Sequence, residues 1–280
     1  MNLTLEKMNS INKVQLDIFK TFVKVCEVLN LKYYMVHGSL LGAVRYNGFF
    51  PFDDDIDVAM PRRDYELLIS NGLKLFPDYL FLQTCSTESE YPLQFAKLRN
   101  SKTAFIQPEM RKLNINQGIY IDIFPIDYYP EGKIVQKWYQ FVDNVYNARI
   151  SKEMVFDGRQ PLWKKVLRRI SVIIIPSWHK AVQKRAALYS NVKNSSKVIT
   201  VGGKATERGI PISWFSDGVK IPFSDLLVVC PSYYKEYLEC IYGNYTIYDP
   251  TAKYMNEDNT VTVSASIVSV DHSYIDILER

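Results

Sequence analysis

The chain has 280 residues, of which 47% are hydrophobic and 23% charged, an ordinary composition for a globular enzyme with a sizeable core. Its net charge of +4 comes without a long block of Lys and Arg, which argues against a nucleic-acid-binding arm. The four cysteines form no Cys-x-x-Cys pair, and no apolar run approaches the length of a spanning helix. We therefore expect reduced thiols in a cytoplasmic protein without a zinc finger, secretory signal or membrane span.

In chain order, the first 130 residues alternate helices with strands, which predicts an α/β or α+β fold. The expected elements are a helix over 10–30, a strand over 31–37, a Gly-Ser turn, a helix over 40–46, an acidic strand around 55–58, a helix over 62–76, and strands over 79–83, 93–99 and 119–124.

The second half is mostly helical in pattern. We expect helices over 134–154, 162–174, 177–192 and 232–242, and a segment with strand and turn patterns over 198–229. Residues 260–270 alternate apolar and polar, and this pattern does not show whether the segment packs against the core. The change of pattern near residue 130 predicts a catalytic core over 1–130 and a helical region over 131–280 that completes its cleft.

The strongest local signal is the acidic run 53–57, with four carboxylates in five residues between apolar segments. Asp55 and Asp57 alternate with apolar residues, as on a strand with one wet face. Two carboxylates on one strand face suit a hard divalent cation such as Mg²⁺ or Mn²⁺. Asp53 and Asp54 are expected to be either loop carboxylates or supporting groups of the same site.

A Gly-Ser turn before a helix predicts a phosphate site, because backbone N–H groups and the helix dipole converge there. Gly38 and Ser39 form this turn. A third metal-ligating carboxylate is expected from a neighbouring strand. Asp122 lies in an apolar segment where an unpaired charge is costly, and Asp127 is a weaker candidate.

These residues resemble the signature of the LicD family. The similarity covers residues 30–250 in several blocks: 37–45 (HGSLLGAVR), 48–62 (GFFPFDDDIDVAMPR), 64–65 (DY), 118–127 (GIYIDIFPID), 242–245 (YGNY) and 249–250 (DP). LicD proteins are related to fukutin-type enzymes and belong to the nucleotidyltransferase-fold superfamily. The resemblance implies a nucleotidyltransferase-like core with a mixed sheet flanked by helices. The zinc-binding Cys cluster of the fukutin-related members is absent from this sequence.

The resemblance also implies metal-dependent transfer of a phosphorylated alcohol, typically phosphocholine from CDP-choline, to a glycan of a cell-surface polysaccharide, teichoic acid or lipopolysaccharide. The superfamily positions correspond to Gly38, Ser39, Asp55, Asp57 and Asp122. Glycerol and ribitol remain open as the alcohol, and a lipid-linked oligosaccharide as the acceptor. Two alternatives stay open: a nucleotidyltransferase that moves an NMP, and a catalytically inert regulatory or scaffolding homologue.

Three basic residues are candidates for contacts with the donor diphosphate, namely Arg45, Lys97 and Arg99, because their donors suit phosphate oxygens. Each could equally be a surface or salt-bridge residue. His37, before the Gly-Ser turn, could touch the substrate or be a core histidine.

The segment 164–175 places basic residues beside a short apolar run. Such a segment could dock on a membrane surface. We expect instead a buried helix with a solvated basic end, because an apolar run of this length is normal in a core.

Overall fold

The computed structural model describes residues 2–51, 53–154, 161–203, 207–249, 255–256 and 260–279. Two residues of the motifs quoted above, Phe52 and Pro250, lie outside these ranges. The side chains of Lys164 and Leu167 also lie outside what the structure describes.

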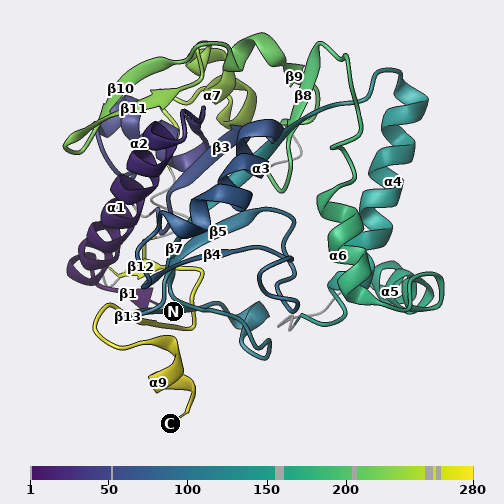
Figure 1. Cartoon of the computed structure of the whole chain (residues 1–280), viewed down its shortest axis with the longest axis horizontal. Coiled ribbons are helices and arrows are strands. Elements are labelled where there is room, and N and C mark those ends of the chain that lie inside the picture. Colours follow the sequence, from purple (N-terminus) through teal and green to yellow (C-terminus); the bar gives the residue numbers. More distant parts are fainter. Residues whose placement is uncertain are drawn as a thin grey trace.

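A mixed β-sheet forms the centre of the fold (Figure 1), as the family resemblance implies. Its main path runs β2-β3-β7-β5-β4, and β8 and β9 extend it from the end of β7. β3 and β7 are parallel, and the other neighbouring pairs are antiparallel. The strands are β2 (Tyr34–Met35), β3 (Asp57–Pro61), β4 (Leu80–Gln83), β5 (Ala96–Asn100), β7 (Ile119–Tyr128), β8 (Lys197–Thr200) and β9 (Ile210–Pro211).

The register of the three central strands brings distant ionisable residues together. Asp57 on β3 lies opposite Asp122 on β7, and Asp122 lies opposite Lys97 on β5. Residues paired across a sheet share a face, so these side chains form one row across three strands. The adjacent pair Val58 and Ile123 points to the other face and is fully buried.

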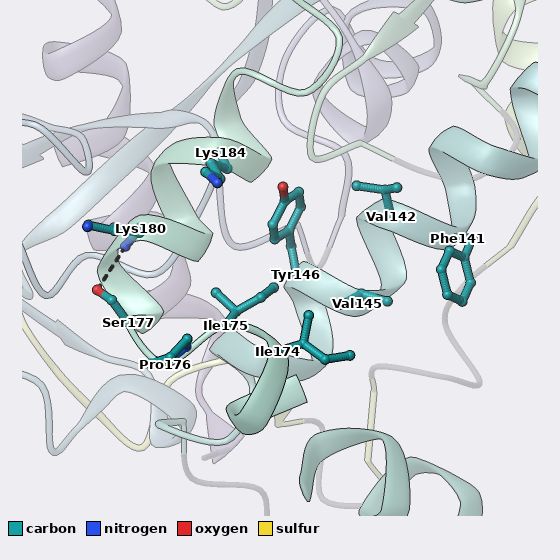
Figure 2. A pocket seen from close by; sticks show the side chains of 10 residues that line it. All are labelled: Phe141, Val142, Val145, Tyr146, Ile174, Ile175, Pro176, Ser177, Lys180 and Lys184. Carbon is teal, nitrogen blue, oxygen red and sulfur yellow. Dashed lines mark hydrogen bonds between the residues drawn. The ribbon is translucent and has the colours of Figure 1, made fainter. Parts of the chain in front are cut away.

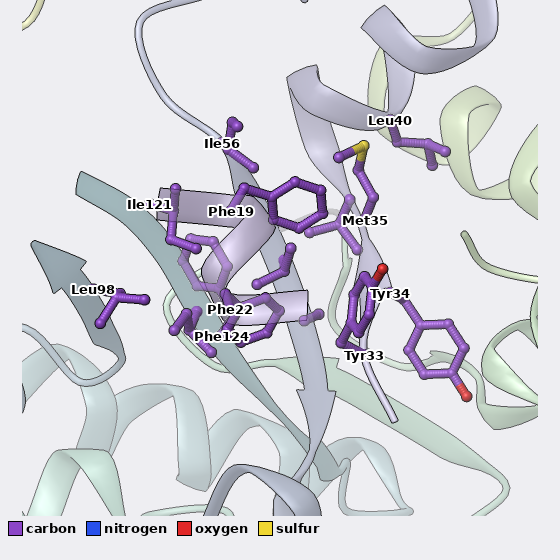
Figure 3. Close-up of a cluster of buried hydrophobic side chains, with 14 of the residues drawn as sticks. Phe19, Phe22, Tyr33, Tyr34, Met35, Leu40, Ile56, Leu98, Ile121 and Phe124 are labelled. Carbon is purple, nitrogen blue, oxygen red and sulfur yellow. The ribbon is translucent and has the colours of Figure 1, made fainter. Parts of the chain in front are cut away.

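Two helices of the first half pack on the sheet. α1 (Leu5–Val28) contacts β7 and β5, and α3 (Arg62–Asn71) contacts β3 and β7. Figure 3 shows Phe19 and Phe22 of α1 in the apolar cluster that also contains Ile121 of β7. Burying large apolar side chains of this kind stabilises the fold by about 1.5–3 kcal/mol each.

α2 (His37–Tyr46) follows β2 directly and contacts α7 (Tyr234–Tyr242) and β3. A hairpin of β10 (Val219–Phe223) and β11 (Leu226–Cys230) lies beside it. The site-bearing start of α2 is thus held between the sheet and C-terminal elements.

The end of the chain returns to the first half. Residues 260–270 do pack: β12 (Val261–Thr262) pairs with β1 (Asn2–Leu3), and β13 (Ile267–Ser269) pairs with β6 (Ala104–Ile106). Since β8 also pairs with β7, strands from both halves of the chain are joined by hydrogen bonds. The division into units near residue 130 stays a prediction. Among the described residues, the remaining short elements are α9 (Tyr274–Leu278) and the 3₁₀ helices Gly72–Lys74, Pro108–Met110 and Ile212–Phe215.

Three helices form a separate group at the right of Figure 1, which we call the helical lobe. It consists of α4 (Lys133–Ile150), α5 (Leu162–Ile174) and α6 (Trp178–Ala186), with α5 and α6 both packed on α4. Among the described residues, no helix combines the length and apolar character needed to cross a bilayer.

The expectation that the segment 164–175 forms a buried helix is wrong. α5 occurs where it was expected, but Ile173 is 81% exposed and Ile174 63%. Ser171 on another side of the helix is fully buried, so the apolar stripe of α5 is not the part of the helix that is covered.

Several other boundaries differ from the expectation. Gly38 and Ser39 lie inside the first turn of α2 instead of in a turn before it, because the helix starts at His37. The strand expected over 31–37 has only two paired residues, the helix expected over 177–192 ends at Ala186, and β6 was not predicted. All four cysteines are free, as expected.

Candidate metal and phosphate site

Three carboxylates converge at the start of β3. Asp55, Asp57 and Asp122 each offer one carboxylate oxygen, and these oxygens lie within 4.8 Å of one another. Asp57 and Asp122 are buried, and Asp55, in the loop before β3, is half-buried. The structure therefore brings together the three residues that the sequence indicated as ligands.

We call these three carboxylates the acidic triad, and their surroundings disfavour the charged forms of Asp55 and Asp122. Burial, and then the negative charge of Asp57, raise the pKa of Asp55 well above its usual value. Burial also raises the pKa of Asp122 to about 6, although the nearby Lys97 lowers it. A cation bound between the carboxylates would relieve this repulsion.

The donor set fits a hard divalent cation. All three candidate ligands are carboxylate oxygens, which suit Mg²⁺, Mn²⁺ or Ca²⁺ better than soft metals. Opposite oxygens around an ion with bonds of about 2.1 Å lie about 4.2 Å apart, so small side-chain adjustments would close the triad around one. The triad could hold a metal ion, and the geometry leaves the identity of that ion open.

Lys97 completes the row on the sheet. Its Nζ lies 2.6 Å from Asp122 Oδ1 and 3.3 Å from the centre of the Tyr120 ring. Burial lowers the pKa of Lys97, and the charge of Asp122 opposes this effect. Because Lys97 engages one oxygen of Asp122, the other oxygen remains for an ion.

The start of α2 lies against the acidic loop. The first intrahelical bond runs from Leu40 N to Val36 O, so the N–H groups of residues 37–39 precede the helical ladder. The Ser39 hydroxyl accepts a hydrogen bond from Asp57 N at 2.9 Å and so joins α2 to β3. A Cβ on Gly38 would lie 2.4 Å from an Asp53 oxygen, so the glycine makes room for that carboxylate.

A buried network holds Asp57 from its other side. His37 Nδ1 lies 3.2 Å from Asp57 Oδ2, and His37 Nε2 lies 2.5 Å from Glu207 Oε1. Tyr237 donates a hydrogen bond to Glu207 Oε2 at 3.2 Å. Burial alone would lower the pKa of His37, but the charges of Glu207 and Asp57 outweigh it and raise the pKa to about 10.

His37 has a left-handed backbone conformation, with φ of 52°. This conformation is uncommon for a residue other than glycine. The strain is offset by two ionic contacts, and it directs the imidazole toward β3. The imidazole is therefore buried, as expected of a core histidine, and it contacts Asp57 of the triad. Contact of His37 with the substrate stays a prediction.

Asp54 has a structural role in the acidic loop. Its backbone oxygen accepts a hydrogen bond from Gln15 of α1 at 2.7 Å. Its side chain accepts one from Ser264 N, also at 2.7 Å. Asp54 thus ties the loop to the first helix and to the end of the chain.

The other basic candidates are placed differently. Arg99 is buried beside the row, and it donates to Gln83 and to the Gly118 carbonyl. Arg45 lies six residues beyond Ser39, about 9 Å along the axis of α2. Its guanidinium donates to the Tyr245 and Tyr248 carbonyls. Of the three basic candidates, Lys97 is the one that contacts the triad; phosphate contacts from any of them stay a prediction.

Asp127, the weaker candidate for the third ligand, lies elsewhere. Five residues after Asp122 on β7, it has the opposite strand parity. It forms a bidentate ion pair with Arg62 of α3, at 2.7 and 2.5 Å.

The residue that the sequence did not reveal is Glu207. It lies about 150 positions after the acidic run in the sequence, next to no recognisable motif, and its side chain is fully buried. No local pattern distinguishes Glu207 from a surface glutamate, so only its position in the fold shows that it contacts His37.

Comparison with known proteins gives one family. Residues 30–164 match the model of LicD/FKTN/FKRP, nucleotidyltransferase domain. This range contains α2, β3 and β7, and therefore all three residues of the triad.

Two curated proteins resemble the chain over a similar length. The lipopolysaccharide cholinephosphotransferase LicD of Haemophilus influenzae is 32% identical over 124 residues, which are 44% of this chain and 45% of that protein. An uncharacterized protein of Rickettsia prowazekii is 31% identical over 122 residues, 42% of each chain. The chain thus spans less than half of the length of these curated relatives.

Proposed function

We propose that the chain is a metal-dependent phosphotransferase, because residues 30–164 match the model of the LicD/FKTN/FKRP nucleotidyltransferase domain. It moves a phospho-alcohol from a CDP-activated donor to a sugar hydroxyl of a cell-surface polysaccharide, teichoic acid or lipopolysaccharide. Phosphocholine is the first candidate for the transferred group, and glycerol phosphate and ribitol phosphate are the others.

The observation that carries this proposal is the acidic triad beside the start of α2. Such a site combines carboxylates for a cation with a helix N-terminus that favours phosphate. The printed name of the Haemophilus influenzae relative, a cholinephosphotransferase acting on lipopolysaccharide, supports the choice of donor and acceptor.

The proposed reaction is a displacement at phosphorus. The oxygen of a sugar hydroxyl forms a bond to the phosphorus that carries the alcohol. The bond from that phosphorus to the bridging oxygen of CMP breaks, and CMP leaves with the electron pair. The hydroxyl proton is lost, so the products are the phospho-alcohol glycan, CMP and a proton.

Each residue of the site has a separate role in this proposal. Asp55, Asp57 and Asp122 would hold the ion, Mg²⁺ or Mn²⁺, which when bound offsets the charge on the diphosphate and on the departing CMP. Lys97 would keep Asp122 oriented, and Ser39 fixes Asp57 by accepting its backbone N–H.

Contacts of Gly38, Arg45 and Arg99 with the donor diphosphate belong to the same proposal. Asp122 is the candidate for accepting the hydroxyl proton when it does not hold the ion. Its pKa of about 6 is closer to neutral pH than that of an exposed aspartate.

We place the reaction in the cytoplasm, at the inner face of the membrane. A CDP-activated donor is made from cytoplasmic nucleotides, and a lipid-linked acceptor would be reached from that side. No nucleic acid is needed as a partner.

A direct test uses a panel of CDP-alcohols, with candidate glycan acceptors, and measures CMP release. The Asp57→Asn variant should lose transfer by about 10³-fold or more, because one ligand of the ion is neutralised. The matched control is Asp217→Asn, since the Asp217 side chain is 98% exposed and distant from the triad in sequence. Thermal unfolding checks that both variants fold.

The mass of the product separates the proposal from its alternatives. A glycan that gains a phospho-alcohol supports phosphotransfer, and a product that gains an NMP indicates a nucleotidyltransferase. Wild-type turnover in Asp57→Asn contradicts the assigned site. Absence of both turnover and metal binding in the wild-type protein indicates an inert homologue.

A further inference from the structure

α5 carries an exposed apolar stripe. Six of its apolar residues are exposed to solvent, and at about 100° per residue they occupy an arc of about 120° on the helix. These exposed residues are Leu162 (77%), Trp163 (63%), Val166 (47%), Ile170 (45%), Ile173 (81%) and Ile174 (63%). A helix that only completes a core would turn this stripe inward.

α4 continues this apolar surface. Its exposed apolar residues recur at helical spacing: Ile134 (86%), Val135 (45%), Trp138 (61%) and Phe141 (56%). Phe141 and Ile174 line one groove of about 410 Å³ between α4, α5 and α6 (Figure 2). The two stripes are therefore neighbours, and together they form what we call the lobe apolar face.

The lobe apolar face is bordered by positive charge. Lys165 and Arg169 lie beyond one edge of the α5 arc, and buried Ser171 lies beyond the other. Lys180 and Lys184 of α6 line the far side of the groove in Figure 2.

The helical lobe has a large excess of positive over negative residues. Residues 133–186 contain 12 Lys and Arg against 3 Asp and Glu, a net charge of +9. The whole chain has a net charge of +4, so the remainder carries −5. The positive charge is therefore concentrated on the part of the molecule that also exposes apolar side chains.

We propose that the helical lobe docks on an anionic membrane surface, with α5 lying in the plane of the lipid headgroups. An exposed apolar stripe with Trp and flanking Lys and Arg is the pattern of interfacial helices. Ile173 and Leu162 would reach the acyl boundary, and Lys165 and Arg169 would contact lipid phosphates.

Charge also argues against a second copy of the chain as the occupant. Two lobes of +9 would repel each other across the interface, whereas anionic lipid neutralises them. This inference is independent of the transferase chemistry, because none of its residues belongs to the acidic triad.

Flotation of the full chain with vesicles tests the proposal. We expect the protein to rise with vesicles of phosphatidylcholine containing about 30 mol% phosphatidylglycerol, and much less with phosphatidylcholine alone. The Leu162→Ser/Ile173→Ser variant should bind on the order of tenfold more weakly or worse, because two apolar anchors are lost.

The chain offers a matched control for this variant. Val28→Ser/Ile247→Ser removes two apolar residues of nearly equal exposure, 72% and 74%, outside the lobe. This control should float like the wild-type protein, and thermal unfolding checks that both double variants are folded.

Charge reversal provides an independent readout. Lys165→Glu/Arg169→Glu should weaken flotation and reduce its dependence on salt, while Lys13→Glu/Lys24→Glu on exposed positions of α1 should not.

Three results would overturn the proposal: no flotation of the wild-type protein with anionic vesicles, an equal loss in the apolar control, or an unchanged Leu162→Ser/Ile173→Ser variant. A wild-type dimer in light scattering that this variant converts to a monomer, without flotation, would assign the face to a second copy.

Discussion

A divalent cation should raise the melting temperature of this protein, and the rise should depend on the acidic triad. The carboxylate oxygens of Asp55, Asp57 and Asp122 lie within 4.8 Å of one another. At an effective dielectric constant of about 20, two unit charges at this distance repel by about 3.5 kcal/mol. Protonation and Lys97 relieve part of this repulsion, and a bound cation would remove the remainder.

The size of the effect follows from linkage. An ion that binds the folded protein alone, at about 100 times its dissociation constant, stabilises it by about 2.7 kcal/mol. For a chain of this length, 1 kcal/mol corresponds to about 2–4 °C in melting temperature. We therefore expect a rise of about 5–10 °C when saturating Mg²⁺ or Mn²⁺ is added to protein stripped with EDTA.

The assay is thermal unfolding followed by circular dichroism, at constant ionic strength. Asp57→Asn and Asp122→Asn should lose most of the rise, and the exposed-residue control Asp217→Asn should keep it. An equal rise in the two triad variants would refute the reasoning, because the ion would then bind elsewhere. No rise in the wild-type protein with any divalent cation would refute it as well.

Two further predictions concern the support of the site. Gly38→Ala should destabilise the protein by about 1–3 kcal/mol and weaken the metal-dependent rise in melting temperature, because the new Cβ would lie 2.4 Å from Asp53. The control Gly48→Ala, whose new Cβ would have no neighbour nearer than 3.6 Å, should have neither effect. Equal melting curves for the two variants would contradict this prediction. Arg62→Met should lower the free energy of unfolding by about 3–5 kcal/mol, because it leaves the buried Asp127 unpaired, yet it should preserve the metal-dependent rise in melting temperature. Loss of that rise would contradict the prediction and show that the ion pair supports the triad.

Much of the site could be predicted from the sequence because its key residues follow local rules. The alternation around Asp57 and the isolated charge of Asp122 both indicate a strand with one polar face. Their exact pairing could not be predicted, because register depends on the neighbouring strands. The sequence predicts Lys97 as either a phosphate contact or a salt-bridge residue, and the structure shows an ion pair with Asp122, a partner that no local pattern revealed.

Glu207 could not be found because its role is entirely tertiary. It contacts His37, 170 positions earlier in the chain, and Tyr237, 30 positions later. A glutamate in a polar segment has no periodic pattern that indicates burial. The start of α2 was placed too late for a related reason: His37 adopts a left-handed conformation that helix signals in the sequence do not anticipate.

α5 shows that the spacing of apolar residues predicts a helix but not the direction in which its apolar side faces. A stripe of apolar residues at helical spacing predicts an amphipathic helix, but it does not say whether the stripe faces a core or another apolar phase. The bounds Leu162–Ile174 were predicted correctly, and the direction of the stripe was not. The signal that separates the two cases lies in the flanking charge, since residues 133–186 carry +9 in a chain of +4. A core helix gains nothing from such an excess, whereas a helix on an anionic surface gains about 1 kcal/mol per basic residue.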